Sequence, residues 1–405
     1  MVCRPGPFSD TMLRYFTAGE SHGETLVAFL SGVPAGLEID QQFIDRELWR
    51  RQQGFGRGGR MKIEKDHAHI VSGVRHGKTI GSPIAILLAN NDWKNWQESL
   101  PVETGDAEKH KPVASPRPGH ADLAGALKYN FAEARYVLER ASARESTSRV
   151  ALGAIAKLFL RHLGIEVLSH VIAVGHASLQ NAEVLWSRLQ ELHAKDEVLL
   201  NCADPETEQR MKADVDQALR TGDSVGGVFE VVAHGVPPGF GTYAQWDERL
   251  DGLLAQAVMS LQAVKAVEIG TGVGSALAFG STVHDEIGYE RSTAQSAFTG
   301  FTRASNHAGG IEGGISNGED ILVRGYLKPI STLRRPLGSI DFASREPVKA
   351  AYERSDVCVV PAAGVAAEAM VALTLAHCAL EKFGGDSMLE TLRNFEGYKQ
   401  QLQRF

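Results

Sequence analysis

The sequence predicts an α+β fold, because helix-like and strand-like stretches share the chain without alternating regularly. Strand-like runs lie at 13–17, 227–233 and 321–327, between clusters of glycine. Four longer stretches have the apolar spacing of helices. A doubly wound parallel sheet would need strand and helix in strict turn, so we favour the mixed architecture.

Each of the four predicted helices is marked by apolar residues that recur at helical spacing. The first, 39–53, sets a few apolar side chains among many charges. The second, 146–163, carries an apolar stripe that stops at Gly164, a residue typical of helix ends. The third and fourth cover 246–267 and 363–382.

Composition limits the classes of function. With 405 residues, of which 43% are hydrophobic, the chain can bury a sizeable core, and its net charge of −7 disfavours a protein that coats nucleic acid or an acidic membrane. Its four cysteines occur singly, which fits a reducing compartment and argues against disulfides and zinc. The N-terminus lacks the apolar core of a signal peptide, and Glu368 and His377 interrupt the longest apolar stretch. We therefore expect a cytoplasmic protein.

A basic run with embedded glycines is the first candidate anion site. It contains Arg46, Arg50, Arg51, Arg57, Arg60, Lys62 and Lys65. Guanidinium groups recognise carboxylate and phosphate through paired hydrogen bonds, and the glycines of GFGRGGR at 54–60 let an anion approach the backbone. Two alternatives stay open: a solvated helix face whose arginines pair with nearby acids, and a single RGG-like element that touches RNA. The acidic net charge makes RNA the weaker one.

Two histidines lie in glycine-containing turns. GESHG at 19–23 follows a strand-like run and exposes His22, whose side chain titrates near neutral pH and suits proton transfer. SPRPGHAD at 115–122 presents Arg117 and His120 together on a turn stiffened by two prolines. On local grounds, each motif also fits an ordinary surface turn.

A further basic segment, ERASAREST at 139–147, brings Arg140 and Arg144 to the start of the second predicted helix. The free N–H groups of a helix start attract anions, and the arginines strengthen that attraction. The alternative is a simple capped helix start, with Ser146 or Thr147 as the cap.

Three other segments are uninformative alone. The glycine-rich run 306–316 resembles a tight hairpin, and KPIST at 328–332 offers a lysine and two hydroxyls to a phosphate. Arg354 and Asp356 are close enough in sequence to form an ordinary structural ion pair. The glycines at 270–274 have the wrong spacing for a dinucleotide fingerprint and no βαβ unit around them.

Taken together, these segments resemble the chorismate synthase family in their order and spacing. The matching strings are GESHG, RRQQGFGRGGRMKIEKD, SPRPGHADLAGALKY, RASARESTSRVALGAIAK, SLQAVKAVEIG, SNHAGGIEGGIS, LKPIST and ERSDVCVVPAAGVAAEAM. The resemblance covers residues 12 to about 380. Residues 1–11 precede its usual start and are expected to be an extension of unassigned role, ahead of a single domain at 12–405. The polar, helical region 177–222 carries no matching motif, and we expect it at the periphery.

The resemblance implies a β-α-β sandwich, with central helices between antiparallel sheets, assembled as a homotetramer. It implies a carbon–oxygen lyase that removes phosphate from 5-enolpyruvylshikimate-3-phosphate by an anti-1,4-elimination. The product is chorismate, the reaction is the last step of the shikimate pathway, and it involves no net redox change. The implied cofactor is reduced FMN. Some members of the family reduce the flavin themselves with NAD(P)H and others need an external reductant, and the motifs do not distinguish the two.

By the same resemblance, roles pass to matching positions one at a time. The substrate-binding residues would be Arg51, Arg57, Arg117 and Arg144. The FMN contacts would be Arg140, Ala141, Ser142, Gln262, Ala263, Gly313, Lys328, Pro329, Ile330, Ser331, Thr332 and Arg354. Among the acid–base residues, His22 would protonate the leaving phosphate, His120 would modulate flavin protonation, and Asp356 would be the base, relayed through the flavin.

Charge counting agrees with this assignment. The substrate carries two carboxylates and a phosphate, about four negative charges near neutral pH, and burying them without cations would be prohibitive. The alternatives are another phosphoanion enzyme, for which we find no nucleotide loop or metal cluster, the RNA-binding module, and a flavin-binding protein without catalysis.

Overall fold

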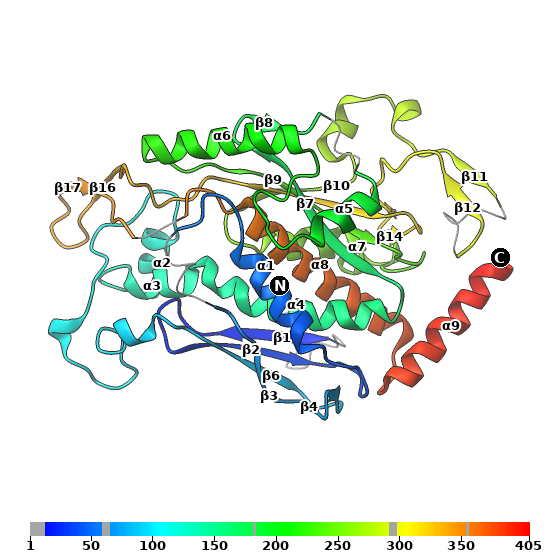
Figure 1. The fold of residues 1–405 in the computed structure, drawn as a ribbon, viewed down its shortest axis with the longest axis horizontal. Helices are drawn as coiled ribbons and strands as arrows, with labels where there is room; N and C mark the ends of the chain where they lie inside the picture. Colours follow the sequence, from blue (N-terminus) through cyan, green and yellow to red (C-terminus); the bar gives the residue numbers. More distant parts are fainter. Residues whose placement is uncertain (1–12, 59–64, 181–183, 291–297, 354–355) are drawn as a thin grey trace.

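The computed structural model describes residues 13–58, 65–180, 184–290, 298–353 and 356–405. Two antiparallel sheets enclose a layer of long helices (Figure 1). The predicted α+β class and the β-α-β sandwich are both confirmed. The extension at 1–11 lies outside the described residues.

The first sheet has the strand order β1-β2-β6-β3, and each neighbouring pair is antiparallel. Its strands are β1 (Arg14–Ala18), β2 (Thr25–Ser31), β6 (Ile84–Ala89) and β3 (His69–Ser72). Alternate residues of β2 and β6 are fully buried, because one face of the sheet packs against the helices. The predicted strand at 13–17 is confirmed as β1.

The second sheet has the order β10-β15-β9-β7-β8 and is also antiparallel. Its strands are β10 (Val264–Ile269), β15 (Ile321–Leu327), β9 (Gly227–His234), β7 (Glu166–Val174) and β8 (Ala177–Ser178). The predicted strands at 227–233 and 321–327 are confirmed as β9 and β15, which pair with each other over seven positions.

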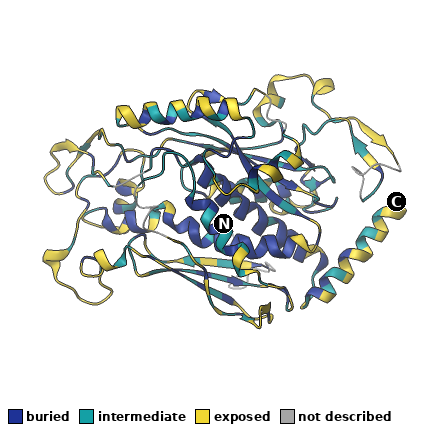
Figure 2. Cartoon of the chain, viewed as in Figure 1, coloured by how far each residue is buried: buried dark blue, intermediate teal, exposed yellow. Residues whose placement is uncertain are grey.

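The central layer consists of α1 (Gln41–Gln52), α4 (Ser146–Arg161) and α8 (Val360–Phe383). The helices α4 and α8 cross where Gly153 meets Ala369, so closely that a Cβ on Gly153 would overlap Ala369. The predicted apolar stripe on α4 understates its burial, because sheet and helices cover it on all sides (Figure 2). Of the described helices, α8 alone is long and apolar enough to cross a membrane, yet 83% of its apolar stretch is buried within the protein, as in a core helix.

The remaining elements surround this sandwich. Helix α6 lies over the outer side of the second sheet (Figure 1). The helices outside the central layer are α2 (Asp122–Tyr129), α3 (Arg135–Ala141), α5 (Trp186–His193), α6 (Pro205–Thr221), α7 (Leu250–Met259) and α9 (Met388–Arg404). Four small strand pairs are β4 (Val74–Arg75) with β5 (Lys78–Thr79), β11 (Ile287–Tyr289) with β12 (Phe301–Arg303), β13 (Ile311–Glu312) with β14 (Ile315–Ser316), and β16 (Gly338–Ile340) with β17 (Pro347–Lys349).

The predicted helix at 246–267 is wrong in its second half. Helix α7 ends at Met259, and the chain then turns into strand β10. Ala263 adopts φ +70°, a left-handed conformation that no helix continues through. The apolar residues on both sides of this turn keep a spacing that suits a helix, so periodicity alone hid the break.

Candidate active site

Three predicted arginines, Arg51, Arg57 and Arg144, meet at the end of α1 and the start of α4. Arg144 Nη1 lies 2.6 Å from Asp66 Oδ1, and Arg51 Nη1 lies 3.8 Å from Asp66 Oδ2. Arg57 Nη1 lies 3.0 Å from Asp356 Oδ2. Among the described residues, this cluster therefore sets three guanidinium groups against two carboxylates. We call these five residues the arginine cluster.

Arg51 is positioned by the residues that begin α4. Its Nε donates to Ser146 Oγ at 2.9 Å, and its Nη2 donates to the carbonyl of Ala143 at 2.8 Å. Ser146 therefore binds Arg51 and does not cap the helix, and no side-chain cap is seen at the Glu145 N-cap position either. Thr147 Oγ1 accepts from Arg144, so it does not serve as the cap.

The electrostatics of Arg51 mark the cluster as rich in positive charge. Burial, together with neighbouring Arg144 and Arg57, lowers the pKa of Arg51 to about 9, although Asp66 opposes the shift. The Nη1 of Arg51 is buried and forms no hydrogen bond among the described residues. A buried donor without a partner is costly, so an anion bound here would find both charge and a hydrogen-bond donor.

His22 lies on the turn between β1 and β2, against helix α3. Its backbone N–H donates to Glu139 Oε2 at 2.7 Å, and its Nδ1 lies 2.8 Å from Glu139 Oε1. The imidazole also stacks on Trp96 with a centroid distance of 4.1 Å. The histidine is thus held on one edge and one face, unlike a side chain in an ordinary surface turn.

His120 and Arg117 share one partner, Asp122 at the start of α2. Arg117 Nε and Nη2 donate to the two oxygens of Asp122 at 2.8 and 3.0 Å, and His120 Nδ1 lies 2.5 Å from Asp122 Oδ1. Burial would raise the pKa of Asp122, but the hydrogen bonds from His120 and Arg117 outweigh it and hold that pKa well below its usual range. Arg117 also donates to Thr332 Oγ1 at 2.9 Å.

Asn90 joins the arginine cluster to the His22 turn. Arg144 Nε donates to Asn90 Oδ1 at 2.9 Å, and Asn90 Nδ2 donates to the carbonyl of Gly23 at 2.7 Å. Helix α3 makes a second link, because Arg135 Nη2 donates to Glu353 Oε1 at 2.9 Å, three residues before Asp356.

The His120 loop joins the same region through segment 328–332. Ser224 Oγ donates to the carbonyl of Ile330 at 2.6 Å, and the next residue, Val225, donates its N–H to Val357 at 3.0 Å. One loop therefore holds Ile330 and Val357, which lie within two residues of Thr332 and Asp356, and this links the three groups of predicted residues into one connected region.

Most of the predicted flavin contacts belong to this region. Lys328 Nζ donates to the carbonyl of Gly119, and Lys328 N–H donates to Ala263 at 3.0 Å. Gln262 donates to Glu145 at 3.1 Å, beside the arginine cluster. Pro329 is exposed and Ser331 is half-buried on the same segment.

Arg140 and its neighbours complete this part of the set. Arg140, at the end of α3, donates to the carbonyl and hydroxyl of Thr17 at 2.8 and 2.9 Å. Ala141 ends α3, and the Oγ of Ser142 accepts from Arg144 N–H at 3.3 Å.

One predicted flavin contact, Gly313, stands apart from this region. Gly313 lies in the turn between β13 and β14, as the predicted hairpin requires, and the neighbouring Gly314 accepts from Leu250 at the start of α7 at 2.9 Å. Ala263 lies beyond the other end of α7, a ten-residue helix that is about 15 Å long. Arg354 lies outside the described residues.

Sequence reasoning missed the acidic and amide partners of these side chains. Asp66, Asn90, Trp96 and Glu139 hold the predicted arginines and His22, and none of them was singled out. Asp66 and Glu139 do lie within the quoted motifs, as acids among basic residues. That composition was the available signal.

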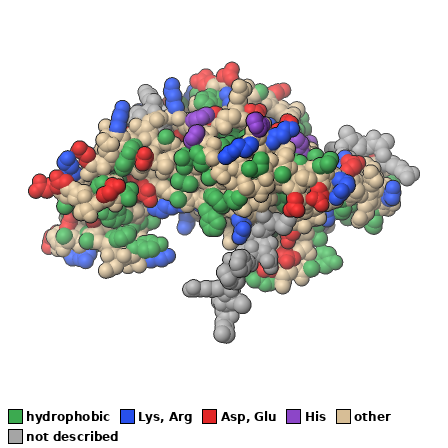
Figure 3. All heavy atoms as spheres, turned by 90° about the horizontal axis from the view of Figure 1, so that it is seen from below, with side chains coloured by type: hydrophobic (Ala, Val, Ile, Leu, Met, Phe, Trp, Pro, Cys, Tyr) green, Lys and Arg blue, Asp and Glu red, His purple; other side chains and the backbone are tan. Residues whose placement is uncertain are grey.

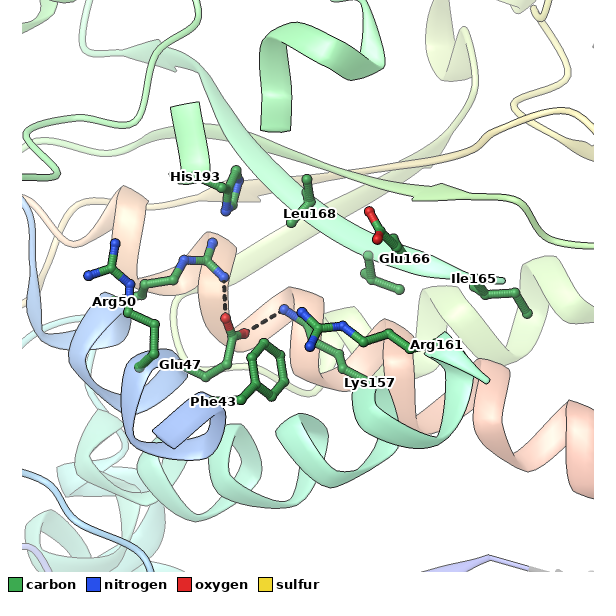
Figure 4. Close-up of a pocket in the computed structure, with 11 residues that line it drawn as sticks. Phe43, Glu47, Arg50, Lys157, Arg161, Ile165, Glu166, Leu168 and His193 are labelled. Atoms are coloured by element: carbon green, nitrogen blue, oxygen red, sulfur yellow. Dashed lines mark hydrogen bonds and ion pairs between the residues drawn. The ribbon is translucent and has the colours of Figure 1, made fainter. Parts of the chain in front are cut away.

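A cavity of about 150 Å³ lies away from this region, between α1, α4, β7 and α5 (Figure 4). Its wall includes Glu47, Arg50 and Lys157, and none of the predicted site residues. Arg50 binds Glu47 at 2.7 Å and Glu368 at 2.6 Å, and Lys157 contacts the same two carboxylates. The charges of Arg50 and Lys157 are therefore already compensated by Glu47 and Glu368.

Comparison with known proteins agrees with the geometry. The family model described as chorismate synthase matches residues 13–380. A chorismate synthase of Koribacter versatilis is 79% identical over 97% of this chain and 100% of its own length, and one of Acidobacterium capsulatum is 70% identical with the same coverage. A crystal structure of chorismate synthase superposes with a TM-score of 0.75 at 40% identity, covering 97% of this chain and 99% of the other.

Proposed function

The chain belongs to the chorismate synthase family, and from this premise we propose that the arginine cluster binds 5-enolpyruvylshikimate-3-phosphate for elimination of its phosphate. The activity is that of chorismate synthase, a lyase of the shikimate pathway. The proposed reaction is an anti-1,4-elimination that yields chorismate without net redox change. The RNA-binding alternative has no support from these relatives.

The observation that carries the substrate proposal is the unbalanced charge around Arg51. Within the described part of the chain, three buried or nearly buried guanidinium groups face two carboxylates, and the pKa of Arg51 is lowered to about 9 by burial and by the neighbouring Arg144 and Arg57. A substrate phosphate or carboxylate would supply the missing negative charge and accept from Arg51 Nη1. Arg117 supports the site differently, because Asp122 and Thr332 already occupy its donors.

Reduced FMN fits the residues around Lys328. Burial, together with neighbouring Lys265, lowers the pKa of Lys328, and the two lysines side by side suit a phosphate group. Arg140 and the left-handed backbone at Ala263 lie in the same connected region. When bound, reduced FMN would supply electron density transiently as the phosphate leaves. NAD(P)H as the source of reducing power stays an open alternative to an external reductant.

The acid–base work falls to three residues of this chain. We assign His22 as the acid that protonates the departing phosphate and Asp356 as the base that receives the ring proton. Arg57 and the N–H of Gly58 hold the two oxygens of Asp356 at 3.0 and 2.5 Å. His120, held by Asp122, would adjust the protonation of the flavin.

Anaerobic turnover tests this proposal. The chain is incubated with 5-enolpyruvylshikimate-3-phosphate and chemically reduced FMN, and chorismate and phosphate are followed together. We expect equal amounts of both products with reduced FMN and none with oxidised FMN. Phosphate release without chorismate would indicate a phosphatase and contradict the assignment.

Assembly and location follow as further proposals. We infer a homotetramer, because side chains on the outward face of the first sheet are apolar, among them Phe16, Val27, Phe29 and Val71. Apolar side chains gather on the face seen from below (Figure 3). Light scattering after gel filtration would measure the assembly. A cytoplasmic location is supported by the three described cysteines, which are free and buried. A single domain at 12–405 is supported by the main core, which runs from Leu13 to Phe395 and is joined only by a small second cluster around Leu138.

A further inference from the structure

The geometry points to a positioning residue for the proton donor: we propose that Glu139 holds His22 so that the proton given to the departing phosphate leaves from Nε2. This inference rests on the proposed function, because it concerns how His22 performs the role assigned to it there. Glu139 itself touches neither substrate nor flavin in this proposal.

One carboxylate makes both contacts that fix His22. Oε2 of Glu139 accepts the backbone N–H of His22 at 2.7 Å, and Oε1 lies 2.8 Å from Nδ1 of the ring. A carboxylate can only accept hydrogen bonds, so Nδ1 must carry a hydrogen. With Nδ1 engaged in this way, the nitrogen that exchanges a proton with the substrate is Nε2.

The ring is also held on its face. Trp96 stacks on it at 4.1 Å with an interplanar angle of 27°, and the indole N–H donates to Asp92 at 3.1 Å. Arg135 lies over the same indole at 5.1 Å. The imidazole is therefore restricted both in its plane and at its Nδ1 edge, which defines the direction of its Nε2–H.

Glu139 stays charged despite its burial. Only 1% of its side chain is exposed. Burial raises its pKa, but contacts with His22 and Arg135 outweigh that effect and leave the pKa lowered. Arg135 lies 3.5 Å from Glu139 and 2.9 Å from Glu353. In the described part of the chain, the charged groups around His22 include Glu139 and Arg135 of α3, and Lys111, whose Nζ lies 4.4 Å from the Trp96 ring centroid.

In the proton step, His22 gives one proton to the departing phosphate. The C–O bond to phosphate breaks and its electron pair leaves on the phosphate oxygen. The Nε2–H bond of protonated His22 breaks and an O–H bond forms on that oxygen. His22 becomes neutral with its hydrogen on Nδ1, and Glu139 remains an anion throughout. The ring proton of the substrate leaves separately, to the base, and the electron pair of its C–H bond forms a new ring double bond as the existing one shifts toward the carbon that loses phosphate.

The test compares Glu139→Gln with a matched control elsewhere in the fold. Glutamine has the shape of glutamate but places an oxygen at only one of the two contact positions and an NH2 donor at the other, so it cannot replace both contacts to His22. Glu230→Gln is the control, because Glu230 is also buried and also bound to a histidine, His170, at 3.1 Å in the second sheet. Both variants lose a buried carboxylate, and only one loses it beside His22.

We expect Glu139→Gln to lower kcat by more than tenfold, within the 10²–10⁴-fold or so that a positioned general acid contributes, with KM little changed. The alkaline limb of its kcat–pH profile should move to lower pH, because a neutral amide stabilises the imidazolium less. Glu230→Gln should keep the kcat of the parent per folded protein. Equal kcat in Glu139→Gln and the parent would overturn the proposal.

A spectroscopic reading separates this inference from the proposed function. Nitrogen NMR of His22 should show hydrogen on Nδ1 in the neutral ring of the parent and a mixture of tautomers in Glu139→Gln. A parent ring with hydrogen on Nε2 alone would overturn the role of Glu139 even if chorismate is made. A parent that makes no chorismate would instead overturn the proposed function and, with it, the proton step.

Discussion

Arg50 and Arg51 are neighbours in the last turn of α1, yet they lie in opposite electrostatic surroundings. Arg50 binds Glu47 and Glu368, and although burial acts against them, these carboxylates raise its pKa above the usual range. Burial and adjacent arginines lower the pKa of Arg51 to about 9. One helix turn thus supports a compensated charge network on one side and an excess of positive charge on the other.

The difference distinguishes charges that stabilise the fold, around Arg50, from charges that can bind a ligand, in the arginine cluster. In the network around Arg50, two cations face two carboxylates, and Ser169 donates a further hydrogen bond to Glu368 at 2.5 Å. In the arginine cluster, three cations face two carboxylates among the described residues. Buried ions normally need full compensation, so an incomplete balance indicates where an anion is meant to bind.

The largest expected effect comes from a substitution in the compensated network around Arg50. Glu368→Gln leaves Arg50 and Lys157 with one carboxylate between them, and removing one partner of a buried ion pair costs about 3–5 kcal/mol. We expect a clear fall in Tm, measured by calorimetry at fixed protein concentration. Glu312→Gln, which breaks an exposed pair with Arg303, is the control and should cost less than about 1 kcal/mol. Similar losses in the two variants would contradict the comparison.

The next largest effect comes from a substitution in the arginine cluster. Arg51→Gln should reduce kcat/KM for 5-enolpyruvylshikimate-3-phosphate by a factor equivalent to about 2–5 kcal/mol, because a charge-assisted contact is lost. Its Tm should change far less than that of Glu368→Gln, since Arg51 is buried without full compensation. Steady-state kinetics and calorimetry on the same preparation provide both numbers. A variant that loses stability and keeps kcat/KM would reverse our reading of the two networks.

The pH dependence of stability tests the compensated network through His193, which lies beside it. Burial, aided by Arg50, lowers the pKa of His193 to about 4. An unfolded histidine titrates near 6.5, so the unfolded chain binds more protons between these values and stability falls as the pH drops from about 6.5 through 4. The full loss from this residue is about 3 kcal/mol. His193→Gln should flatten that part of the curve of Tm against pH, and an unchanged slope would contradict the assignment.

The sequence predicted the helices and strands of each layer better than the turns that connect them. The strand at Ile321–Leu327 was recognisable because its buried residues alternate to the end, and the helix at Val360–Phe383 because its apolar stretch is too long for a strand. The break between α7 and β10 was not, because the left-handed backbone of Ala263 leaves no trace in the apolar spacing. Burial of α4 on all sides was likewise invisible, since a covered polar face depends on what packs there.

The candidate site divides in the same way. Arginines and histidines in glycine-rich turns could be named from the sequence, and the structure brings most of them together. Their partners could not, because Asp66 and Glu139 act through contacts between segments far apart in the chain: Arg144 lies 78 residues from Asp66, and His22 lies 117 residues from Glu139. The role of a carboxylate within a basic motif depends on which distant side chains the fold places beside it.

The crossing of α4 and α8 sets a limit on how this protein can be re-engineered. Gly153 and Ala369 bring the two backbones together with almost no side chain between them. A bulkier residue at either position would push the helices apart and carry the first turn of α4, with Ser146, away from Arg51. A designer who wants a roomier site should therefore vary the loops ahead of α4 and leave this crossing untouched.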